Sequence, residues 1–415
     1  MIRNFFKKLS WKSWLFLLIV AMLVFESPIE SVWEPFSYLD EVFGLLFFPL
    51  LLLRVVRRRA WPRLTRRQWV MVALLGVVLL TGFAGYLINR YQPLWNTLCD
   101  AYINVKFYLA IGVGYMLFEE CDFERLEREI YPGLNLITLV LFVLCLFDLV
   151  FQVYPSESRW GLRAIQLFYN SKTTLVAEGV FLSALYLRIS EYKKMQVLPW
   201  LGMLCFIILW TLRFKAICAV FCILLLWWLI CRRGKKLTPL TWGVLGGGVV
   251  AIGLPQMLFY FYKGMQEYYA RPILTLASFY VGADYFPFGT GWATYGSYFS
   301  ISPFSPVYEM YQLNQIWGLS EEYSQYIADN FWPMILAQCG YIGLACYVAV
   351  VALLGLAVLR LGKKNVYAYA SGLLAMLYLL ICSTSESAFA GPVAIPFAFL
   401  LGFLFAEDGA ERPAP

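Results

Sequence analysis

Long apolar segments, separated from one another mostly by short polar ones, occupy most of this 415-residue chain. Each is about as long as a helix must be to cross the ~30 Å hydrocarbon core of a bilayer. A segment within lipid must satisfy its own backbone hydrogen bonds, which restricts it to helices and closed barrels, and these segments are too long for barrel strands. The sequence therefore predicts an all-α, polytopic membrane helix bundle that forms one integral membrane domain over residues 1–415.

The distribution of charge predicts how the chain is threaded through the membrane. Basic residues gather in alternate loops, whereas the loop 27–41 contains acidic residues and no basic one. Lys and Arg accumulate on the cytoplasmic side of membrane proteins. This rule explains the net charge of +7 without nucleic acid and places both termini in the cytoplasm. We expect about twelve spans, at 13–26, 42–56, 68–88, 102–118, 133–153, 173–188, 197–212, 216–231, 239–260, 331–359, 366–383 and 391–406.

One predicted loop is much longer than the others. Residues 261–330 should lie outside the cytoplasm, and they are rich in Tyr, Phe and Trp. Disordered segments have low hydrophobicity, so we expect this extracytoplasmic segment to fold as a cap over the membrane domain. The polar tail 407–415 is expected to be disordered.

The chain contains no histidine, which excludes the usual general base, His-activated nucleophiles and His-based zinc sites. The ten cysteines lie mostly within apolar segments and predict neither a disulfide framework nor a metal site. No phosphate-binding glycine loop is present, so ATP is not expected as a direct energy source. We expect no metal and no cofactor.

Some basic residues lie in loops on the predicted outer side, where such residues are usually scarce. One interpretation is that these side chains snorkel to lipid headgroups. Arg213 and Lys215 fit it less well, because they lie in a very short turn between two spans. A guanidinium grips phosphate through two hydrogen bonds and a lysine adds a point charge. The pair therefore predicts an anion site, with diphosphate as the natural ligand. The remaining members of this set are Arg90, Arg159, Arg163, Lys172, Lys263 and Arg271.

Three carboxylates lie near the same predicted surface. Asp148 and Glu178 are about 7 Å inside the outer ends of their spans, and Glu386 lies on the last outer turn. Carboxylates at such depth usually face the bundle interior or a wet cavity. Each is either a structural partner of a nearby arginine or part of a site. The charged groups gather in the outer third of the membrane, which disfavours a transport site at the midplane.

The stretch Asp284–Gly296 combines aromatic residues with glycines. Aromatic rings pack against the C–H faces of sugars, and Gly289 and Gly291 permit turns or close backbone approach. The stretch therefore predicts a sugar site. The alternative interpretation is that its aromatic side chains only contact lipid headgroups.

Four motifs, in their order and loop placement, resemble those of the O-antigen polymerase/ligase-like family of bacterial polysaccharide membrane proteins. They are Arg159-Trp-Gly-Leu-Arg163, Thr211-Leu-Arg-Phe-Lys215-Ala, Phe286-Pro-Phe-Gly-Thr-Gly-Trp-Ala-Thr-Tyr-Gly296, and Asp329-Asn-Phe-Trp-Pro333 followed by Gln338-Cys-Gly-Tyr-Ile-Gly343. Tyr169-Asn-Ser-Lys172 stands where many members have His-Pro, and the long loop lacks the histidine that ligases of the family need. The resemblance therefore favours a polymerase.

The resemblance implies a GT-C-like, metal-independent glycosyltransferase in the bacterial cytoplasmic membrane. Its substrate would be a polyprenyl-diphosphate-linked oligosaccharide at the outer face, beside membrane lipid and, as further partners, a flippase and a chain-length regulator. The alternatives are a ligase with a lipid, wall or protein acceptor, or a transporter of the lipid-linked sugar. The implied catalytic residues are Arg213, Lys215, Asp329 and Glu386. The implied substrate-binding residues are Arg159, Arg163, Lys172, Glu178, Arg271, Asp284, Gly289, Gly291 and Trp292.

Overall fold

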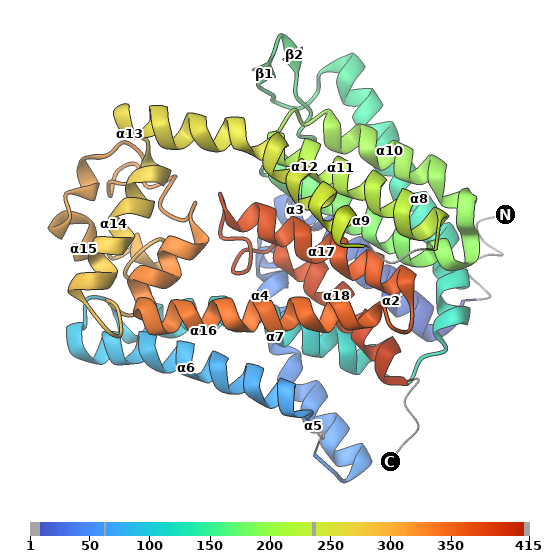
Figure 1. Cartoon of the computed structure of the whole chain (residues 1–415), viewed down its shortest axis with the longest axis horizontal. Helices are drawn as coiled ribbons and strands as arrows, with labels where there is room; N and C mark the ends of the chain where they lie inside the picture. The colour runs from blue at the N-terminus through green and yellow to red at the C-terminus, as the bar shows by residue number, and fades with distance from the viewer. Residues whose placement is uncertain (1–8, 62–63, 235–237, 411–415) are drawn as a thin grey trace.

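The computed structural model describes residues 9–61, 64–234 and 238–410, and these ranges are mostly helical (Figure 1). Within them the only strands are β1 (Ser158–Arg159) and β2 (Leu162–Arg163), which pair as one short antiparallel hairpin. The expected all-α class is confirmed for this part of the chain.

Eight helical stretches in the described part of the chain are long and apolar enough to cross a membrane. They are α6 (Arg66–Asn89), α7 (Leu94–Phe118), α8 (Phe123–Phe151), α9 with α10 (Lys172–Leu209), α11 with its π-helical end (Phe214–Arg232), α12 to α13 (Pro239–Gln266), α16 (Phe331–Leu361) and α17 (Val366–Ser383). A ninth arises if α2 (Trp11–Val24) and α3 (Glu26–Val32), which meet at 71°, form one bent span. The chain is thus a polytopic helical membrane protein.

The difference from twelve spans has a physical cause in each case. The predicted span 42–56 is split into α4 (Leu39–Leu45) and the 12-residue α5 (Phe47–Arg58). The predicted span 391–406 corresponds to α18 (Ala394–Ala410), which has only 17 residues and is packed within the bundle, with Ile395 and Leu400 fully buried. The predicted spans 173–188 and 197–212 belong to one continuous stretch of 38 residues, in which the chain reverses at a 3-10 turn (Lys194–Val197), so that α10 (Leu198–Leu209) packs back against α9 (Lys172–Lys193).

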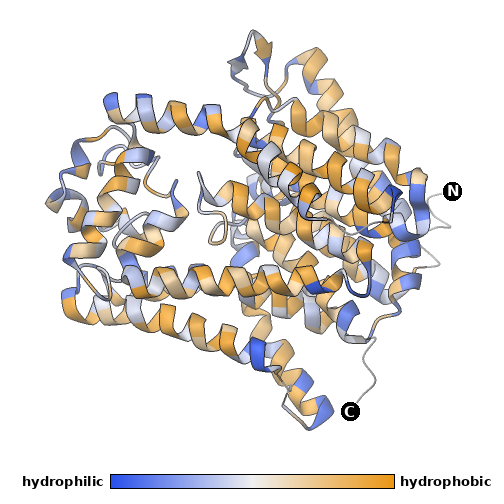
Figure 2. Cartoon of the chain, in the orientation of Figure 1, coloured by the Kyte–Doolittle hydropathy of each residue, from blue (hydrophilic) through white to orange (hydrophobic). Residues whose placement is uncertain are grey.

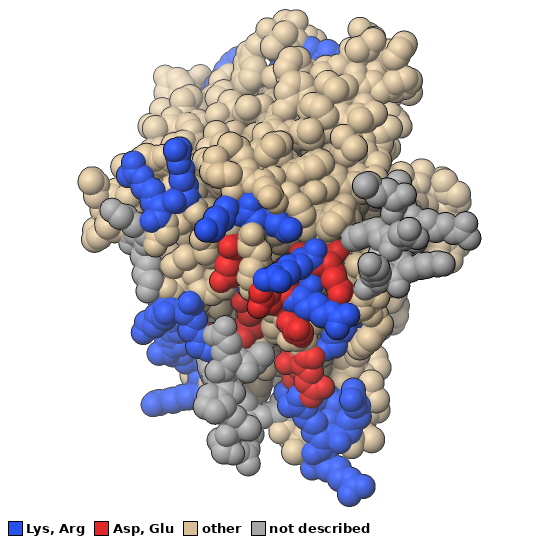
Figure 3. Space-filling model, turned by 90° about the vertical axis from the view of Figure 1, so that its right-hand side faces the viewer, with Lys and Arg blue, Asp and Glu red and all other residues tan. Residues whose placement is uncertain are grey.

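The two ends of the helix bundle differ in charge. At one end, α5, α9, α11 and α16 finish on basic residues, among them Arg58, Lys193, Arg232 and Arg360. We call this end the basic face, and Figure 3 looks onto it and shows Lys and Arg gathered around a smaller group of acids. We call the opposite end, where α9, α11 and α16 begin, the loop face. Apolar residues dominate the helices between the two (Figure 2), as lipid-facing helices require.

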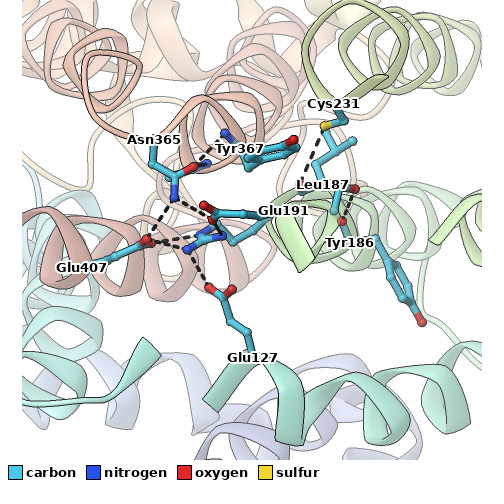
Figure 4. A network of polar contacts seen from close by, with 11 residues as sticks. Glu127, Tyr186, Leu187, Glu191, Cys231, Asn365, Tyr367 and Glu407 are labelled. Atoms are coloured by element: carbon cyan, nitrogen blue, oxygen red, sulfur yellow. Dashed lines mark hydrogen bonds and ion pairs between the residues drawn. The ribbon is translucent and has the colours of Figure 1, made fainter. Parts of the chain in front are cut away.

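A buried ion cluster near the basic face joins three helices (Figure 4). Arg188 of α9 has a side chain only 1% exposed and lies 3.0 Å from Glu127 of α8, 2.6 Å from Glu191 and 2.5 Å from Glu407 of α18. Asn365, which caps α17, donates to Glu191 and Glu407 at 2.8 and 3.3 Å. Residues 407–410 are therefore helical, and the expected disorder is wrong for them; 411–415 lie outside the described residues.

The long loop is shorter than expected and has internal packing of its own. The helix begun at α12 (Pro239–Leu258) continues through Phe259–Lys263 and α13 (Gly264–Gln266), so we define the cap as residues 267–330. The cap contains α14 (Ala270–Asp284), α15 (Pro306–Met310) and 3-10 turns at Tyr298–Ser300 and Leu313–Gln315. A separate hydrophobic cluster holds these elements together and reaches α16 through Ala337. Its buried members include Leu274, Val281, Tyr295, Val307, Tyr308 and Ile327.

Candidate functional site

Charged side chains from segments far apart in the sequence meet at the loop face. They come from the loop before α9, the first turns of α9, α11 and α14, the residue two before α16, and the α17–α18 loop. In Figure 1 that last loop projects toward the cap, and the Ser387 hydroxyl donates to the Ala328 carbonyl at 2.7 Å. We call the group the charged cluster: Glu157, Arg159, Lys172, Arg213, Lys215, Arg271, Asp329 and Glu386. Seven of these eight were predicted from the sequence.

One half of the charged cluster is built around Glu157. Its Oε2 atom accepts from Lys172 Nζ at 2.9 Å and lies 3.7 Å from Arg213 Nη2. Lys172 is nearly inaccessible, because it opens α9 directly after the N-cap Ser171. The hydrogen bond from Lys172 lowers the pKa of Glu157 below its ordinary value. Arg159 lies in the same half of the cluster and donates to the Leu212 carbonyl at 3.4 Å.

The turn between α10 and α11 fixes Arg213. The Thr211 hydroxyl donates to the Ile208 carbonyl at 2.7 Å, and Leu212 adopts a left-handed φ of 54°, which reverses the chain. Arg213 then occupies the N-cap position of α11 (Phe214–Leu226). Burial lowers its pKa, as does the neighbouring Arg159. Its Nε atom is buried without a hydrogen-bond partner, whereas the side chain as a whole is 31% exposed, so the outer nitrogens of the guanidinium are open to a ligand.

The other half of the charged cluster contains two ion pairs. Lys215 binds Glu386, and Arg271 Nη2 lies 2.9 Å from Asp329 Oδ2. Burial raises the pKa of Asp329 above its ordinary value, and Arg271 partly opposes this effect. Glu386 and Lys215 also act on Asp329, so the two pairs are neighbours. The Nε atom of Arg271 is buried without a hydrogen-bond partner, like that of Arg213.

The balance of charge defines what the cluster can bind. Five basic side chains face three carboxylates, which leaves an excess of two positive charges. Arginines with unpaired donors suit bidentate recognition of phosphate oxygens. The half-buried Asp329 has a raised pKa, which favours a role in proton transfer. The arrangement can therefore bind a doubly charged anion beside a carboxylate that accepts a proton.

Arg163 does not belong to this site, contrary to the prediction. Its guanidinium donates to Ser156 Oγ (2.6 Å), to the carbonyl and Oδ1 of Asp148 (2.8 and 3.2 Å) and to the Tyr154 carbonyl (2.5 Å). These bonds engage all three of its nitrogens. Arg163 and Asp148 therefore hold the start of the 152–171 loop in place, and the structural interpretation of Asp148 is the correct one.

Glu178 and Asp284 also lie apart from the charged cluster. Glu178 is buried within α9, and the charged group that acts on it is Glu26. Asp284 is exposed at the far end of α14, where it accepts a hydrogen bond from the Tyr311 hydroxyl at 2.6 Å. Since α14 begins beside Arg271, its 15 residues separate Asp284 from the cluster by about 20 Å.

The glycine-rich stretch packs closely against α6 and α16. The Trp292 ring is fully buried, and its indole nitrogen donates to the Leu79 carbonyl of α6 at 3.3 Å. A Cβ added to Gly291 (φ 102°) would lie 2.5 Å from the Tyr86 nitrogen of α6, and one on Gly289 would lie 2.6 Å from backbone atoms of α16. These three residues are buried and lie apart from the charged cluster, and their substrate-binding role stays a prediction.

Residues that the sequence did not single out support both the glycine-rich stretch and the charged cluster. Asp100 of α7 is buried and accepts hydrogen bonds from the Ala293 nitrogen (2.7 Å) and the Ser297 hydroxyl, which fixes the glycine-rich stretch. The pair Gly82 and Gly85 makes room for it on α6. Small residues one turn apart within a span do signal close approach. Glu157 carried no such signal, because nothing distinguishes it from an ordinary loop glutamate.

Comparison with protein-family models and with curated proteins finds no match for this chain. The function is therefore argued from the charged cluster itself.

Proposed function

We propose that this protein polymerises polyprenyl-diphosphate-linked oligosaccharide units at the outer face of the bacterial cytoplasmic membrane. The observation that carries the proposal is the convergence of Arg159, Lys172, Arg213, Lys215 and Arg271 at one end of a membrane helix bundle. Their excess of two positive charges over the neighbouring carboxylates equals the charge of a diphosphate diester. A site at the end of the helices suits a lipid-linked substrate, whose charged headgroup lies at the membrane surface.

The proposed orientation follows from the positions of the basic residues. The basic face collects the ends of α5, α9, α11 and α16, and the positive-inside rule places such an end in the cytoplasm. The loop face, the charged cluster and the cap then lie outside. The sequence predicts a twelve-span, GT-C-like arrangement. The proposal needs only one property of it, an even number of membrane crossings, which keeps both termini on one side.

The proposed reaction transfers the growing chain to a new unit. The acceptor hydroxyl oxygen attacks the anomeric carbon of the chain, and the bond from that carbon to the diphosphate oxygen breaks. The hydroxyl proton passes to Asp329, the electron pair of the broken bond stays on the diphosphate oxygen, and polyprenyl diphosphate leaves with three negative charges. Arg213 and Arg271 stabilise the leaving group through donors that have no partner within the protein, and such charge stabilisation is often the largest catalytic contribution.

The remaining members of the cluster have supporting roles in this scheme. Lys172 and Arg159 hold the diphosphate from the α9 side, where both lie beside Arg213. Lys215, paired with Glu386, lies on the side of Asp329 and compensates its negative charge until the proton has been taken up. The proposed partners are thus the lipid-linked oligosaccharide and membrane lipid, with a flippase and a chain-length regulator acting before and during polymerisation.

A ligase would use the same donor and the same cluster with another acceptor. Deleting the gene distinguishes the two functions. Loss of a polymerase leaves single lipid-linked repeat units and no long polymer. If long polymer persists but is no longer joined to its final acceptor, the protein is a ligase. If lipid-linked units accumulate only on the cytoplasmic side, it is a transporter.

A further inference from the structure

Glu157 occupies the position between two fixed cations of the charged cluster. A single oxygen, Oε2, accepts the hydrogen bond from Lys172 and faces Arg213 at 3.7 Å. That oxygen stands where an oxygen of a phosphate would lie if it bound Lys172 and Arg213 together. Glu157 is therefore an anion supplied by the protein itself to its own anion site.

The partners differ strongly in exposure. The Lys172 side chain is 2% exposed and that of Arg213 31%, whereas that of Glu157 is 68% exposed. Glu157 lies in a loop immediately before the β1–β2 hairpin, whose two strands contain only two residues each. The two cations are thus held by helix ends, and the carboxylate can rotate into solvent without disturbing buried packing. Because the buried Lys172 needs a counterion, a ligand that displaces Glu157 must place an anionic oxygen in the same position.

We propose that the Glu157 carboxylate competes with ligands for this anion site. A ligand must displace it, and lipid headgroups that carry a single negative charge are thereby excluded. This inference rests on the proposed function, because it concerns the same site. The surrounding membrane offers anionic phospholipids with one charge per headgroup. When such a headgroup replaces Glu157, its interactions with Lys172 and Arg213 only compensate for the interactions that Glu157 loses. A diphosphate brings a second charge for the remaining excess of the cluster, so it displaces Glu157 with a net gain.

The test compares wild type, Glu157→Gln and Glu157→Asp, with Glu322→Gln as a control at an exposed position of the cap. Purified protein in neutral detergent binds a fluorescent polyprenyl diphosphate, and phosphatidylglycerol, with one charge, competes against it. Phosphatidylcholine serves as the neutral lipid control. The measured quantity is the affinity for phosphatidylglycerol, obtained from its competition with the diphosphate.

We expect Glu157→Gln to raise the affinity for phosphatidylglycerol by about fivefold, because the partly exposed pair of Glu157 with Arg213 contributes up to about that factor. Glu157→Asp, which keeps the charge, and Glu322→Gln should retain the wild-type affinity. An unchanged affinity for phosphatidylglycerol in Glu157→Gln, with the diphosphate still bound, overturns the role of Glu157 and leaves the proposed function intact. If wild type and all variants fail to bind the diphosphate, the proposed function is wrong and the inference falls with it.

Discussion

Arg213 combines a fixed position at the start of α11 with a guanidinium that is partly exposed at the charged cluster. If that guanidinium holds the leaving diphosphate, Arg213→Lys keeps the charge and loses the bidentate geometry. We expect polymer formation to fall at least about tenfold, which corresponds to a loss of ~1.4 kcal/mol in the transition state. The measurement is polymer yield per unit of membrane-inserted protein.

Arg90→Lys is the matched control for this substitution. Arg90 caps the C-terminal end of α6 on the loop face, is exposed and has a left-handed φ of 52°. The same change there should leave polymer yield within twofold of wild type, as is usual for surface positions. Equal yields from Arg213→Lys and Arg90→Lys would mean that Arg213 only anchors its turn among headgroups.

The pH dependence of the reaction tests the role of Asp329. A general base must be ionised, so activity should rise as pH rises through the pKa of Asp329. Burial places that pKa above the ordinary value, and Arg271 at 2.9 Å lowers it in part. Arg271→Gln removes the opposing effect, so the acid limb of the pH–rate profile should move to higher pH. Arg159→Gln should lower activity without moving the limb. An identical limb in both variants would exclude Asp329 as the base.

For single residues, sequence reasoning succeeded where basic side chains lay on the predicted outer side, on which they are usually scarce. Basic residues on the predicted outer side identified Arg159, Lys172, Arg213, Lys215 and Arg271, all of which meet in the charged cluster. The same rule included Arg163, because a sequence does not reveal that backbone carbonyls occupy its donors. It missed Glu157, because an acidic residue outside the cytoplasm is not unusual.

At the scale of elements, the glycine-rich stretch packs tightly between α6 and α16 as a packing wedge, with its backbone close to both helices. Gly291 meets the α6 backbone at a φ of 102°, where any side chain is both strained and obstructed. We expect Gly291→Ala to destabilise the protein by about 2–4 kcal/mol, from backbone strain and lost packing. Thermal unfolding in detergent measures the effect.

Gly253 of α12 offers the matched control, because nothing lies within 4 Å of an added Cβ there. Gly253→Ala should leave stability unchanged or raise it by about 0.5–1 kcal/mol, the helix propensity difference. If both substitutions have the same small effect, the stretch is not a packing wedge, and its sugar-binding role must be reconsidered.

The ion cluster around Arg188 makes a second prediction about elements. Three carboxylates share this one buried guanidinium. Arg188→Met leaves them without their cation, so the free energy of unfolding should fall by about 3–5 kcal/mol. Glu127→Gln should cost much less, because it relieves an excess of negative charge. Equal losses from the two substitutions would show that the charge balance does not stabilise the junction of α8, α9 and α18.

Element boundaries were predictable where helices face lipid and less so where they face protein. The spans that match α6, α8 and α17 begin and end within about ten residues of the structure, because hydropathy reports contact with lipid. α18 is equally apolar but is enclosed by its neighbours, and hydropathy does not separate these two environments. The helix also extends to Ala410 because Glu407 pairs with Arg188 across more than two hundred residues of chain.

At the scale of the whole molecule, the orientation in the membrane can be measured by labelling. Arg59 lies at the end of α5 on the basic face, and Glu322 lies in the cap; both are exposed. A membrane-impermeant thiol reagent applied to intact cells should label Glu322→Cys and not Arg59→Cys. The reverse pattern would place the charged cluster in the cytoplasm and would contradict the proposed site of polymerisation.

The central claim is that the charged cluster drives chain growth on a lipid diphosphate, and reconstitution tests it most directly. Purified protein in liposomes is given one class of substrate, a polyprenyl-diphosphate-linked oligosaccharide, with no other protein present. Chain length is followed by gel electrophoresis. The account predicts a ladder of polymers together with release of polyprenyl diphosphate, both strongly reduced in Arg213→Lys and absent in Asp329→Asn. Single units that remain unextended with the well-folded wild-type protein would contradict the account.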